Sequence, residues 1–321
     1  METLAFGPIP SRRLGRSLGI NNIPAKTCTY SCVYCQLGET ADTITERRVF
    51  YNTDDILKDV KRKVDEAFSM GEDIDYLTFV PDGEPTLDIN LGQTISSLKN
   101  IGIPIAVLTN ASLIWQEDVK EDLFEADLVS LKVDAVGEDL WERMDRPHKN
   151  LKLSAILEGI SDFVKEFRGS VISETMLLGT IDYTGEFGKI AYFLEQLRNL
   201  EKAYIAIPTR PPTESWVRPA KEEMINLAFQ VFSEKLGRDK VEYLIGYEGD
   251  SFASTGNAED DLLSITAVHP MRKEAVEKFL KKAKADWELV NRLLQEDELT
   301  EVEYEGNRYY MRILPSRRKI Q

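Results

Sequence analysis

The stretch Lys26-Thr-Cys-Thr-Tyr-Ser-Cys-Val-Tyr-Cys-Gln36 decides the fold of this chain, because it holds all three cysteines of the 321 residues. Cys28, Cys32 and Cys35 have the spacing Cys-x3-Cys-x2-Cys. Three thiolates on one short loop can bind three irons of a [4Fe–4S] cluster and leave the fourth iron without a protein ligand. An open coordination position is typical of a site where chemistry takes place, whereas four cysteines close a cluster for structure or electron transfer.

A structural zinc site with a distant fourth ligand is the alternative interpretation of the three cysteines. The chain has only two histidines, His148 and His269, and neither lies at zinc-ligand spacing from the cysteines. Free reactive thiols are less favoured still, because three neighbouring cysteines oxidise to a disulfide in the absence of a metal. We therefore favour an iron–sulfur site and retain zinc as the alternative.

The cysteine spacing, with Tyr34 directly before the last cysteine, resembles the radical S-adenosylmethionine (SAM) superfamily. The resemblance implies that the open iron binds the amino and carboxylate groups of SAM. It also implies that one electron cleaves SAM to methionine and a 5′-deoxyadenosyl radical, which abstracts hydrogen from a substrate, and that Tyr34 lies near the adenine. The cofactors then supply the chemistry, while the protein binds and orients them.

Composition indicates a globular protein with one large domain, or one large and one small. Hydrophobic residues make up 42% and charged residues 30%, which is ordinary for such proteins. No stretch approaches the ~18 apolar residues that a membrane span needs, and the N-terminus does not have the pattern of a signal peptide. Because every cysteine belongs to one motif, none is left for disulfides, and we predict a reducing, cytoplasmic location.

The net charge of −15 argues against general binding to nucleic acid. The charge is uneven, however: residues 262–321 hold 12 Lys and Arg against 10 Asp and Glu, a net +2, and the remainder is at −17. If a polyanion binds, this C-terminal segment is the better candidate. Its possible phosphate-contacting residues are Lys273, Lys278, Lys281, Lys282, Lys284, Arg317, Arg318 and Lys319. A solvated lysine face on a helix is the alternative.

Predicted strands and helices alternate through most of the chain. Repeated β–α units of this length imply parallel strands with right-handed crossovers. Six units predict an α/β fold, an open or partial (β/α)6 TIM-like barrel, which the radical SAM resemblance also implies. In such barrels the chemistry lies at the C-terminal ends of the strands, where the cysteine loop begins. The strands are predicted at 17–23, 76–80, 103–108, 128–133, 171–178 and 203–207, and the helices at 53–69, 91–100, 115–124, 151–167 and 185–198.

The pattern changes after the Gly/Ser-rich segment 246–257. Three predicted helices precede a strand–turn–strand with Gly306-Asn307 at the turn, and together they resemble a winged helix-turn-helix. We therefore expect a radical SAM partial barrel at 1–250 and a winged-helix-like module at 251–321. The helices are predicted at 259–267, 271–283 and 286–295, and the strands at 299–304 and 308–313.

Candidate cofactor-binding residues follow the second and third predicted strands. The stretch Pro81-Asp-Gly-Glu-Pro-Thr86 resembles the family's Gly-Gly-Glu motif, with Asp82 in place of the first glycine. The resemblance implies that the backbone here, with Gly83 and Glu84, meets the SAM amino group; an ordinary turn is the alternative. It also implies that Thr109 and Asn110 contact the SAM carboxylate or ribose, where the alternative is a helix or turn cap.

Charged residues on the fourth and fifth predicted strands are further candidates. Lys132 and Asp134 lie on the same side of an alternating strand, and Glu174 interrupts an otherwise apolar strand. Charges that face a barrel lumen are unfavourable unless they are paired or bind a ligand. We therefore expect these three residues to contact SAM, with a mutual ion pair of Lys132 and Asp134 as the alternative.

Arginines near the predicted barrel mouth are candidates for contacting an anionic substrate, because guanidinium groups bind phosphate and carboxylate well. Solvated surface arginines are the commoner case. The proline-rich stretch 208–219, which follows the sixth strand, is one candidate lid over the site, and the C-terminal module is the other. The candidate arginines are Arg12, Arg13, Arg16, Arg143, Arg146 and Arg210.

Residues 6–22 (FGPIPSRRLGRSLGINN), with the cysteines and Gln36-Leu-Gly38, resemble small prokaryotic radical SAM proteins grouped with the tRNA wyosine-base synthases. Those synthases carry more cysteines for a second cluster, and this chain has none left for one. The resemblance therefore implies the same fold group for this chain but not the same reaction. Three hypotheses follow. The protein is a radical SAM enzyme that modifies RNA, such as tRNA, or a nucleotide; a radical SAM enzyme that acts on a peptide, protein or small metabolite; or an iron–sulfur regulator that binds DNA. The resemblance implies a flavodoxin- or ferredoxin-type electron donor.

Overall fold

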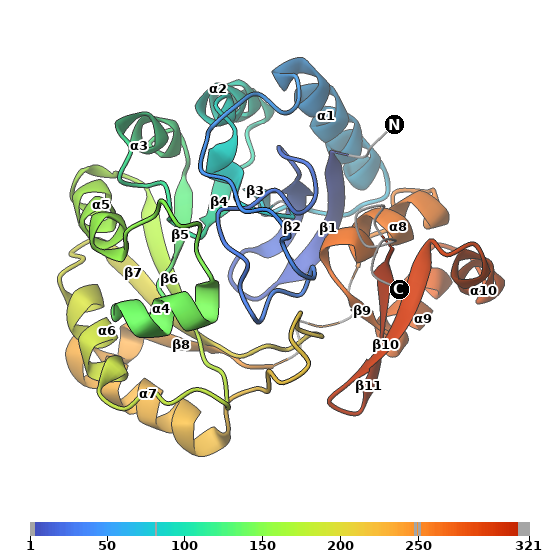
Figure 1. Cartoon of the computed structure of the whole chain (residues 1–321). Helices are drawn as coiled ribbons and strands as arrows, with labels where there is room; N and C mark the ends of the chain where they lie inside the picture. The colour runs from blue at the N-terminus through green and yellow to red at the C-terminus, as the bar shows by residue number, and fades with distance from the viewer. Residues whose placement is uncertain (1–3, 81, 247–248, 250–251, 314–321) are drawn as a thin grey trace.

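An eight-stranded sheet, curled into a half-barrel, forms the body of the molecule (Figure 1). The computed structural model describes residues 4–80, 82–246, 249 and 252–313. The strands lie in sequence order; β1 and β2 form an antiparallel hairpin, and every neighbouring pair from β2 to β8 is parallel. They are β1 Ala5–Ser11, β2 Gly15–Ile20, β3 Tyr76–Phe79, β4 Ile105–Thr109, β5 Leu128–Lys132, β6 Ser170–Met176, β7 Leu200–Ala206 and β8 Val241–Leu244.

The predicted partial barrel is confirmed, with eight strands where the sequence pattern indicated six. The two strands that were not predicted, β1 and β8, lie at the two edges of the sheet. β1 contains Pro8 and Pro10, which are tolerated in an edge strand because its outer side needs no ladder hydrogen bonds. β8 has only four residues, too few to show an alternating pattern.

Helices cover the convex face of the sheet, as the crossover connections require (Figure 1). In α1, Ile56, Val60 and Val64 recur at helical spacing and are buried, and the Asn52 side chain caps the helix by accepting from the Asp54 N–H. Two helices, α4 and α7, were not predicted. The helices are α1 Thr53–Ser69, α2 Leu91–Leu98, α3 Glu117–Leu123, α4 Glu138–Asp145, α5 Leu153–Glu166, α6 Glu186–Glu195 and α7 Glu222–Leu236.

The concave face of the sheet is layered. Leu128, Ser130 and Lys132 of β5 point to the same side, because alternate residues of a strand share a face. Lys132 lies in register with Glu174 of β6, so a charged layer lies toward the C-terminal ends of the strands. The rest of this face carries an apolar cluster of Leu14, Ala106, Leu128, Ile172, Tyr204, Ala206 and Leu244.

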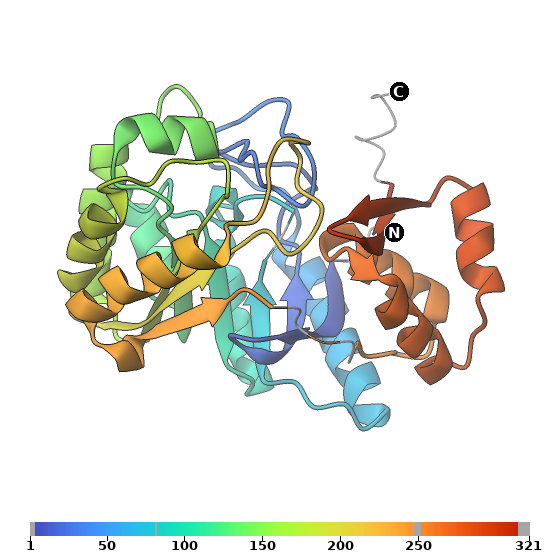
Figure 2. The same cartoon turned by 90° about the horizontal axis from the view of Figure 1, so that it is seen from below.

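The C-terminal residues form a smaller unit with its own core, beside β1 (Figure 2). Its strands form an antiparallel sheet in the order β10-β11-β9, and Phe252, Phe279 and Tyr310 belong to its core. The three predicted helices and the hairpin are present, and the short β9 was not predicted. The predicted boundary between 250 and 251 lies outside the described residues. The elements are α8 Ala258–Val268, β9 Met271–Arg272, α9 Lys273–Lys282, α10 Glu288–Gln295, β10 Leu299–Tyr304 and β11 Asn307–Arg312.

A buried ion pair fixes the C-terminal unit to the barrel. Lys63 of α1 lies 2.9 Å from Asp261 of α8, and both side chains are almost fully buried. Lys63 also donates to the Thr255 hydroxyl at 2.8 Å, and Asp261 accepts from the Thr255 N–H at 2.6 Å. Because each charge has several partners, the pair can be accommodated in the interior. The unit therefore has a defined position against the half-barrel.

Candidate functional site

The three cysteines lie on the loop between β2 and α1, at the C-terminal end of the parallel strands, and each is half-buried. The backbone N–H of Cys35 donates to the Cys32 carbonyl at 3.1 Å, which brings these two residues together in one turn. A polar side-chain atom lies near each sulfur: Asn110 Nδ2 at 3.6 Å from Cys28, Asp145 Oδ1 at 3.4 Å from Cys32, and Lys26 Nζ at 3.9 Å from Cys35.

The protein surroundings alone disfavour the thiolate form of these cysteines. Burial, with a smaller contribution from Glu84, raises the pKa of Cys28 to about 12, and burial with the nearby Asp145 raises the pKa of Cys32 well above its usual range. Iron binds the thiolate form of cysteine. Because the protein surroundings do not stabilise that form, the positive charge of the metal has to stabilise it. Three sulfurs on one loop fit a metal cluster that brings this charge, and Lys26 lowers the pKa of Cys28 in the same direction.

A cluster and a single metal ion demand different arrangements of ligands. Within the described part of the chain, no three His, Cys, Asp or Glu side chains are arranged to hold one metal ion together. A [4Fe–4S] cluster does not require such convergence, because each thiolate binds a different iron.

Gly83 holds the cysteine loop against the end of β3. A Cβ atom on Gly83 would lie 1.8 Å from the backbone oxygen of Thr27, so only glycine permits this approach. The same oxygen accepts from the Glu84 N–H at 3.0 Å, and the Lys26 N–H donates to the Asp82 carbonyl at 2.6 Å. The stretch that resembles a cofactor-binding motif therefore contacts the cysteine loop and holds it in place.

Glu84 links the ends of β3 and β4. Its side chain is 1% exposed; Oε1 accepts from the hydroxyls of Thr86 and Thr109, each at 2.6 Å, and Oε2 accepts from the Asn110 N–H at 2.7 Å. Burial raises the pKa of this carboxyl, and the hydrogen bonds offset only part of the effect. We call Asp82, Gly83, Glu84, Thr109 and Asn110 the anchoring cluster.

Tyr34 lies between two buried carboxyl groups. Its hydroxyl is 2.9 Å from Asp145 Oδ1 and also contacts Asp134, whose other oxygen accepts from the Met176 N–H at 2.7 Å. One hydroxyl proton serves one of these contacts, so the other requires a protonated carboxyl group. Burial raises the pKa of both Asp134 and Asp145, against the opposing charge of Lys132 at Asp134 and with the added repulsion of Asp134 at Asp145, which agrees with this requirement. Asp145 was not predicted as a site residue, because helix α4, which carries it, was not predicted.

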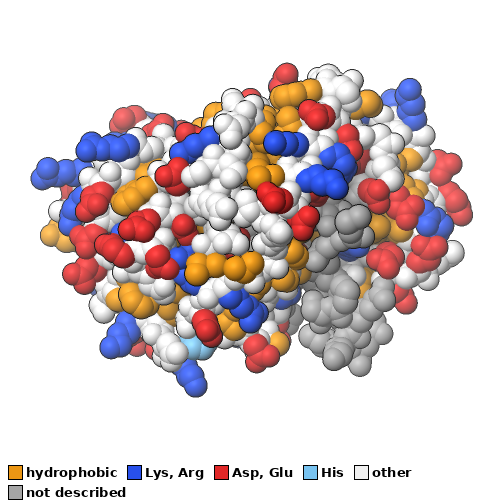
Figure 3. All heavy atoms as spheres, turned by 90° about the horizontal axis from the view of Figure 1, so that it is seen from above, with side chains coloured by type: hydrophobic (Ala, Val, Ile, Leu, Met, Phe, Trp, Pro, Cys, Tyr) orange, Lys and Arg blue, Asp and Glu red, His pale blue; other side chains and the backbone are white. Residues whose placement is uncertain are grey.

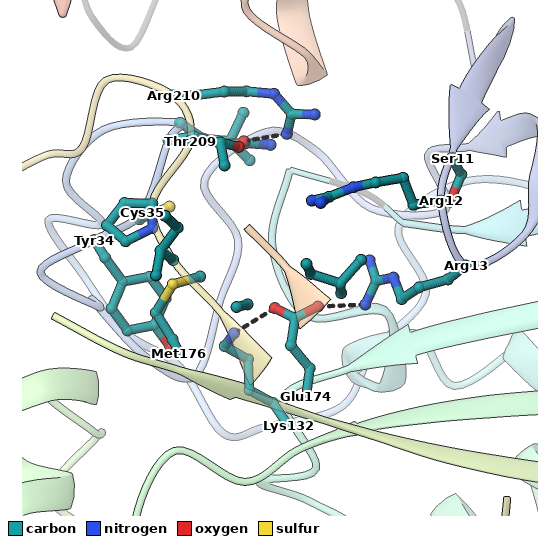
Figure 4. Close-up of a pocket in the computed structure, with 16 residues that line it drawn as sticks. Ser11, Arg12, Arg13, Tyr34, Cys35, Lys132, Glu174, Met176, Thr209 and Arg210 are labelled. Atoms are coloured by element: carbon teal, nitrogen blue, oxygen red, sulfur yellow. Dashed lines mark hydrogen bonds and ion pairs between the residues drawn. The ribbon is translucent and has the colours of Figure 1, made fainter. Parts of the chain in front are cut away.

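A cavity of about 290 Å³ opens beside the cysteine loop (Figure 4). Within it Lys132 Nζ lies 2.8 Å from Glu174 Oε1, and Arg13 pairs with the other oxygen of Glu174. Burial alone would raise the pKa of Glu174, but Lys132 and Arg13 outweigh it and lower that pKa to about 2. The lining residues that carry the argument are Arg12, Arg13, Tyr34, Lys132, Glu174 and Arg210.

The structure divides the predicted cofactor-binding residues into two groups. Tyr34, Lys132 and Glu174 line the cavity, and Asp134 is buried behind Tyr34, 3.7 Å from Lys132. Lys132 is at hydrogen-bond distance from Glu174. Its predicted ion pair with Asp134 is present at a longer N–O distance. The remaining five predicted residues form the anchoring cluster. Gln36 and Met176, which also line the cavity, were not predicted as site residues.

The candidate arginines also separate. Arg12, Arg13 and Arg210 line the cavity, whereas Arg16 pairs with Asp73 at the surface, 2.5 Å away. Arg146 pairs with Glu214 of the proline-rich segment, also at 2.5 Å.

The proline-rich segment 208–219 lies between the cysteine loop and the C-terminal hairpin. The Thr213 hydroxyl donates to the Cys35 carbonyl at 2.7 Å, and the Glu214 N–H donates to the Val33 carbonyl at 3.1 Å. From the other side, the hydroxyls of Tyr304 and Tyr309 donate to the carbonyls of Pro208 and Thr209 at 3.1 and 2.8 Å. The segment thus borders the site, and its role as a lid stays a prediction.

Comparison with known families agrees with the cysteine loop and the half-barrel. The sequence model of the radical SAM superfamily matches residues 22–190, just over half of the chain. This protein belongs to the radical SAM superfamily. A UPF0026 protein of Methanocaldococcus jannaschii is 48% identical over 99% of this chain and 98% of its own length. A UPF0026 protein of Synechocystis is 39% identical over 64% of this chain and 76% of its own.

Solved radical SAM structures share the fold. A radical SAM methyltransferase from Sphaerobacter thermophilus aligns with 71% of this chain and 66% of its own, at a TM-score of 0.55 and 15% identity. SuiB of Streptococcus suis bound to SAM aligns with 70% of this chain at a TM-score of 0.51 and 14% identity, and the match spans about half of SuiB (49%). At these identities the likeness concerns the fold.

Radical SAM enzymes use a [4Fe–4S] cluster and SAM, so the cofactors predicted from the sequence are confirmed and the chain is an enzyme of this type. The relation to wyosine-base synthases stays a prediction. Among the helices that the structure describes, none is long and apolar enough to cross a membrane.

Proposed function

We propose that Cys28, Cys32 and Cys35 bind the [4Fe–4S] cluster and that SAM lies beside Tyr34, at the end of the cavity that Lys132 and Glu174 border. When bound, the cofactors supply reductive cleavage of SAM to methionine and a 5′-deoxyadenosyl radical that takes hydrogen from a substrate. One observation carries the proposal: Cys35 and Tyr34 line the same cavity as the charged layer of the half-barrel.

The protein's own residues hold the cysteine loop, orient Tyr34 and cover part of the site. The anchoring cluster fixes the cysteine loop on β3 and β4, and the buried hydroxyl of Tyr34 is held by Asp134 and Asp145. The segment 208–219 covers the backbone at Cys35 through Thr213. Exclusion of water protects a reactive intermediate from side reactions, which is the role that we assign to this segment.

Anaerobic reconstitution tests the proposal. We expect about four irons per chain, and release of 5′-deoxyadenosine once dithionite and SAM are added. The variants Cys28→Ser, Cys32→Ser and Cys35→Ser should each lose most of the iron and all of this release, with the unreduced wild type as the control. Binding of zinc in place of iron, or an iron cluster that does not cleave SAM, contradicts the proposal.

We also propose that the C-terminal unit is a winged-helix-type module. The order helix, strand, two helices and two strands, with a three-stranded antiparallel sheet, supports this assignment. In helix-turn-helix proteins the second helix of the motif, which corresponds to α10 here, approaches nucleic acid. α10 and the following hairpin, residues 288–312, hold seven acidic and three basic residues. Acidic side chains also gather over this module in Figure 3.

This charge distribution favours a small substrate over nucleic acid. An acidic α10 and hairpin repel phosphates, which weighs against both a DNA-binding regulator and RNA contact through the usual helix. RNA or tRNA remains the second candidate. It is supported by the basic segment 271–284, which holds six basic and two acidic residues. Part of this charge is neutralised, since Lys282 pairs with Glu72. Arg317, Arg318 and Lys319 lie outside the described residues.

A salt titration distinguishes the two candidates. If tRNA is the substrate, its affinity should fall steeply with salt and the variant Lys278→Gln should reduce the slope by about one. A small-molecule enzyme should show weak tRNA binding that Lys278→Gln does not change. We further propose a flavodoxin- or ferredoxin-type electron donor and a reducing cytoplasmic location, supported by the use of every cysteine in the cluster loop.

A further inference from the structure

A second cavity adjoins the first. It has a volume of about 120 Å³ and shares Ser11, Arg13, Gln36 and Arg210 with the larger cavity. Its far wall comes from the C-terminal module, through Val268 and His269 at the end of α8. The remaining wall is largely apolar and includes Phe6, Ile9, Leu14, Val80 and Leu108. The two spaces form one recess, which runs from the cysteine loop to the C-terminal module.

The recess concentrates positive charge in an acidic protein. Arg12, Arg13, Lys132 and Arg210 line it, and Glu174 is the one Asp or Glu side chain among the described residues that line either cavity. The lining carries three positive charges in excess, with histidine taken as neutral, whereas the whole chain has a net charge of −15. A recess of one sign with poorly polarisable walls attracts ligands of the opposite sign.

The arginines are directed into the recess from opposite sides (Figure 4). Arg210 Nη1 donates to Gln36 Oε1 at 2.6 Å, and its Nη2 lies 3.1 Å from His269 Nε2. A guanidinium group only donates hydrogen bonds, so this histidine nitrogen accepts and Arg210 is fixed by both the cysteine loop and the C-terminal module. Arg12 and Arg13 come from the turn of the β1–β2 hairpin. Arginine held in this way loses little entropy when it binds an oxyanion through two hydrogen bonds.

We propose that the recess binds a small substrate that carries a phosphate or carboxylate group, with Arg12, Arg13 and Arg210 as the contacts of that group. The apolar wall of the second cavity takes a short carbon skeleton. This inference rests on the proposed function, because it places the substrate next to SAM on the Tyr34 and Cys35 side of the recess.

The test uses the reconstituted holoprotein at saturating SAM without reductant, so that the SAM site is filled and SAM stays intact. Inorganic pyrophosphate and succinate, a phosphate and a carboxylate probe, are titrated separately by calorimetry. We expect one of them to bind, and Arg12→Gln and Arg210→Gln to weaken it about tenfold, the equivalent of one lost charge-assisted hydrogen bond. Arg16→Gln is the matched control, since Arg16 lies near the same hairpin turn but pairs with Asp73 at the surface.

The outcomes separate the inference from the function on which it rests. Preference for pyrophosphate assigns a phosphate substrate, and preference for succinate a carboxylate. The inference is overturned if neither probe binds, if Arg16→Gln weakens binding as much as Arg12→Gln does, or if the probe competes with SAM, because the arginines would then bind the SAM carboxylate. Release of 5′-deoxyadenosine is measured on the same preparations: its presence without probe binding removes the inference alone, and its absence removes the proposed function as well.

Discussion

Two groups of polar residues end neighbouring strands of the half-barrel, and they do different work. In the anchoring cluster at the ends of β3 and β4, Glu84 is buried and accepts hydrogen bonds from uncharged donors. The charged group on β5 and β6, Lys132 and Glu174 with Arg13, opens on the cavity. One group holds the cysteine loop and the other faces ligands. Contact between the anchoring cluster and SAM stays a prediction.

The two glutamates show the contrast most clearly. Burial raises the pKa of Glu84, whose partners are hydroxyls and N–H groups. Burial acts on Glu174 in the same direction, yet Lys132 and Arg13 reverse it and lower that pKa to about 2. The environment thus makes Glu84 a structural hydrogen-bond acceptor and keeps Glu174 negatively charged. Changes at each group should accordingly affect different measurements.

The largest effect is expected from Gly83→Ala in the anchoring cluster. The new Cβ would meet the backbone of Thr27 at 1.8 Å, and neither backbone segment can yield without moving the cysteine loop. We expect a loss of about 3 kcal/mol or more in the free energy of unfolding, the upper part of the range for overpacking. Iron content after reconstitution should fall with it. Urea unfolding and iron analysis measure the two effects.

Gly188→Ala is the control for this prediction. Gly188 lies within α6, and nothing stands within 4 Å of an added Cβ. Alanine there should stabilise the helix by up to about 1 kcal/mol and leave the iron content unchanged. Equal iron content in the Gly83 and Gly188 variants would show that the anchoring cluster does not support the cysteine loop.

The sequence predicted most of the barrel but could not separate these two groups. α1 has apolar residues at helical spacing, and its bounds, 53–69, were predicted as observed. Gly83 and Glu84 were singled out through a resemblance. What they touch depends on Thr27, Thr109 and Asn110, which approach only after the chain folds. Asp145 was missed because α4 is short, and its contact with Tyr34 spans 111 residues of chain.

Asp88, four residues after Glu84 of the anchoring cluster, should make the free energy of unfolding depend on pH. Burial raises its pKa to about 6, from an ordinary value of 3.8. Between these values the folded state binds more protons at Asp88 than the unfolded state, so the contribution of Asp88 to stability is greatest below about pH 4 and falls as pH rises toward 6. The loss can reach about 3 kcal/mol. Urea unfolding of Asp88→Asn across this range should lack the fall; curves parallel to the wild type would refute the assignment.

Glu84→Gln should come next in size. The amide keeps one acceptor oxygen but turns its NH2 group toward either the Thr86 N–H or the Asn110 N–H, and in both cases a buried N–H donor loses its acceptor. We expect a loss of about 2 kcal/mol in the free energy of unfolding. Lower iron occupancy should accompany it, because Asn110 also contacts Cys28. Unchanged stability and full iron content would mean that Glu84 is not an anchor.

Glu174→Gln is the matched change in the charged group and should have the smallest effect on stability. The Glu174 side chain is 15% exposed, so cavity water screens part of the charge that is lost. We expect a loss of about 1 kcal/mol and full iron content. Removing the one negative charge of the recess should instead tighten pyrophosphate or succinate binding, because Arg13 and Lys132 then lack their counter-ion. Calorimetry checks this opposite sign: a variant that loses iron, or that binds the anion more weakly, would place Glu174 with the anchors and remove the distinction between the two groups.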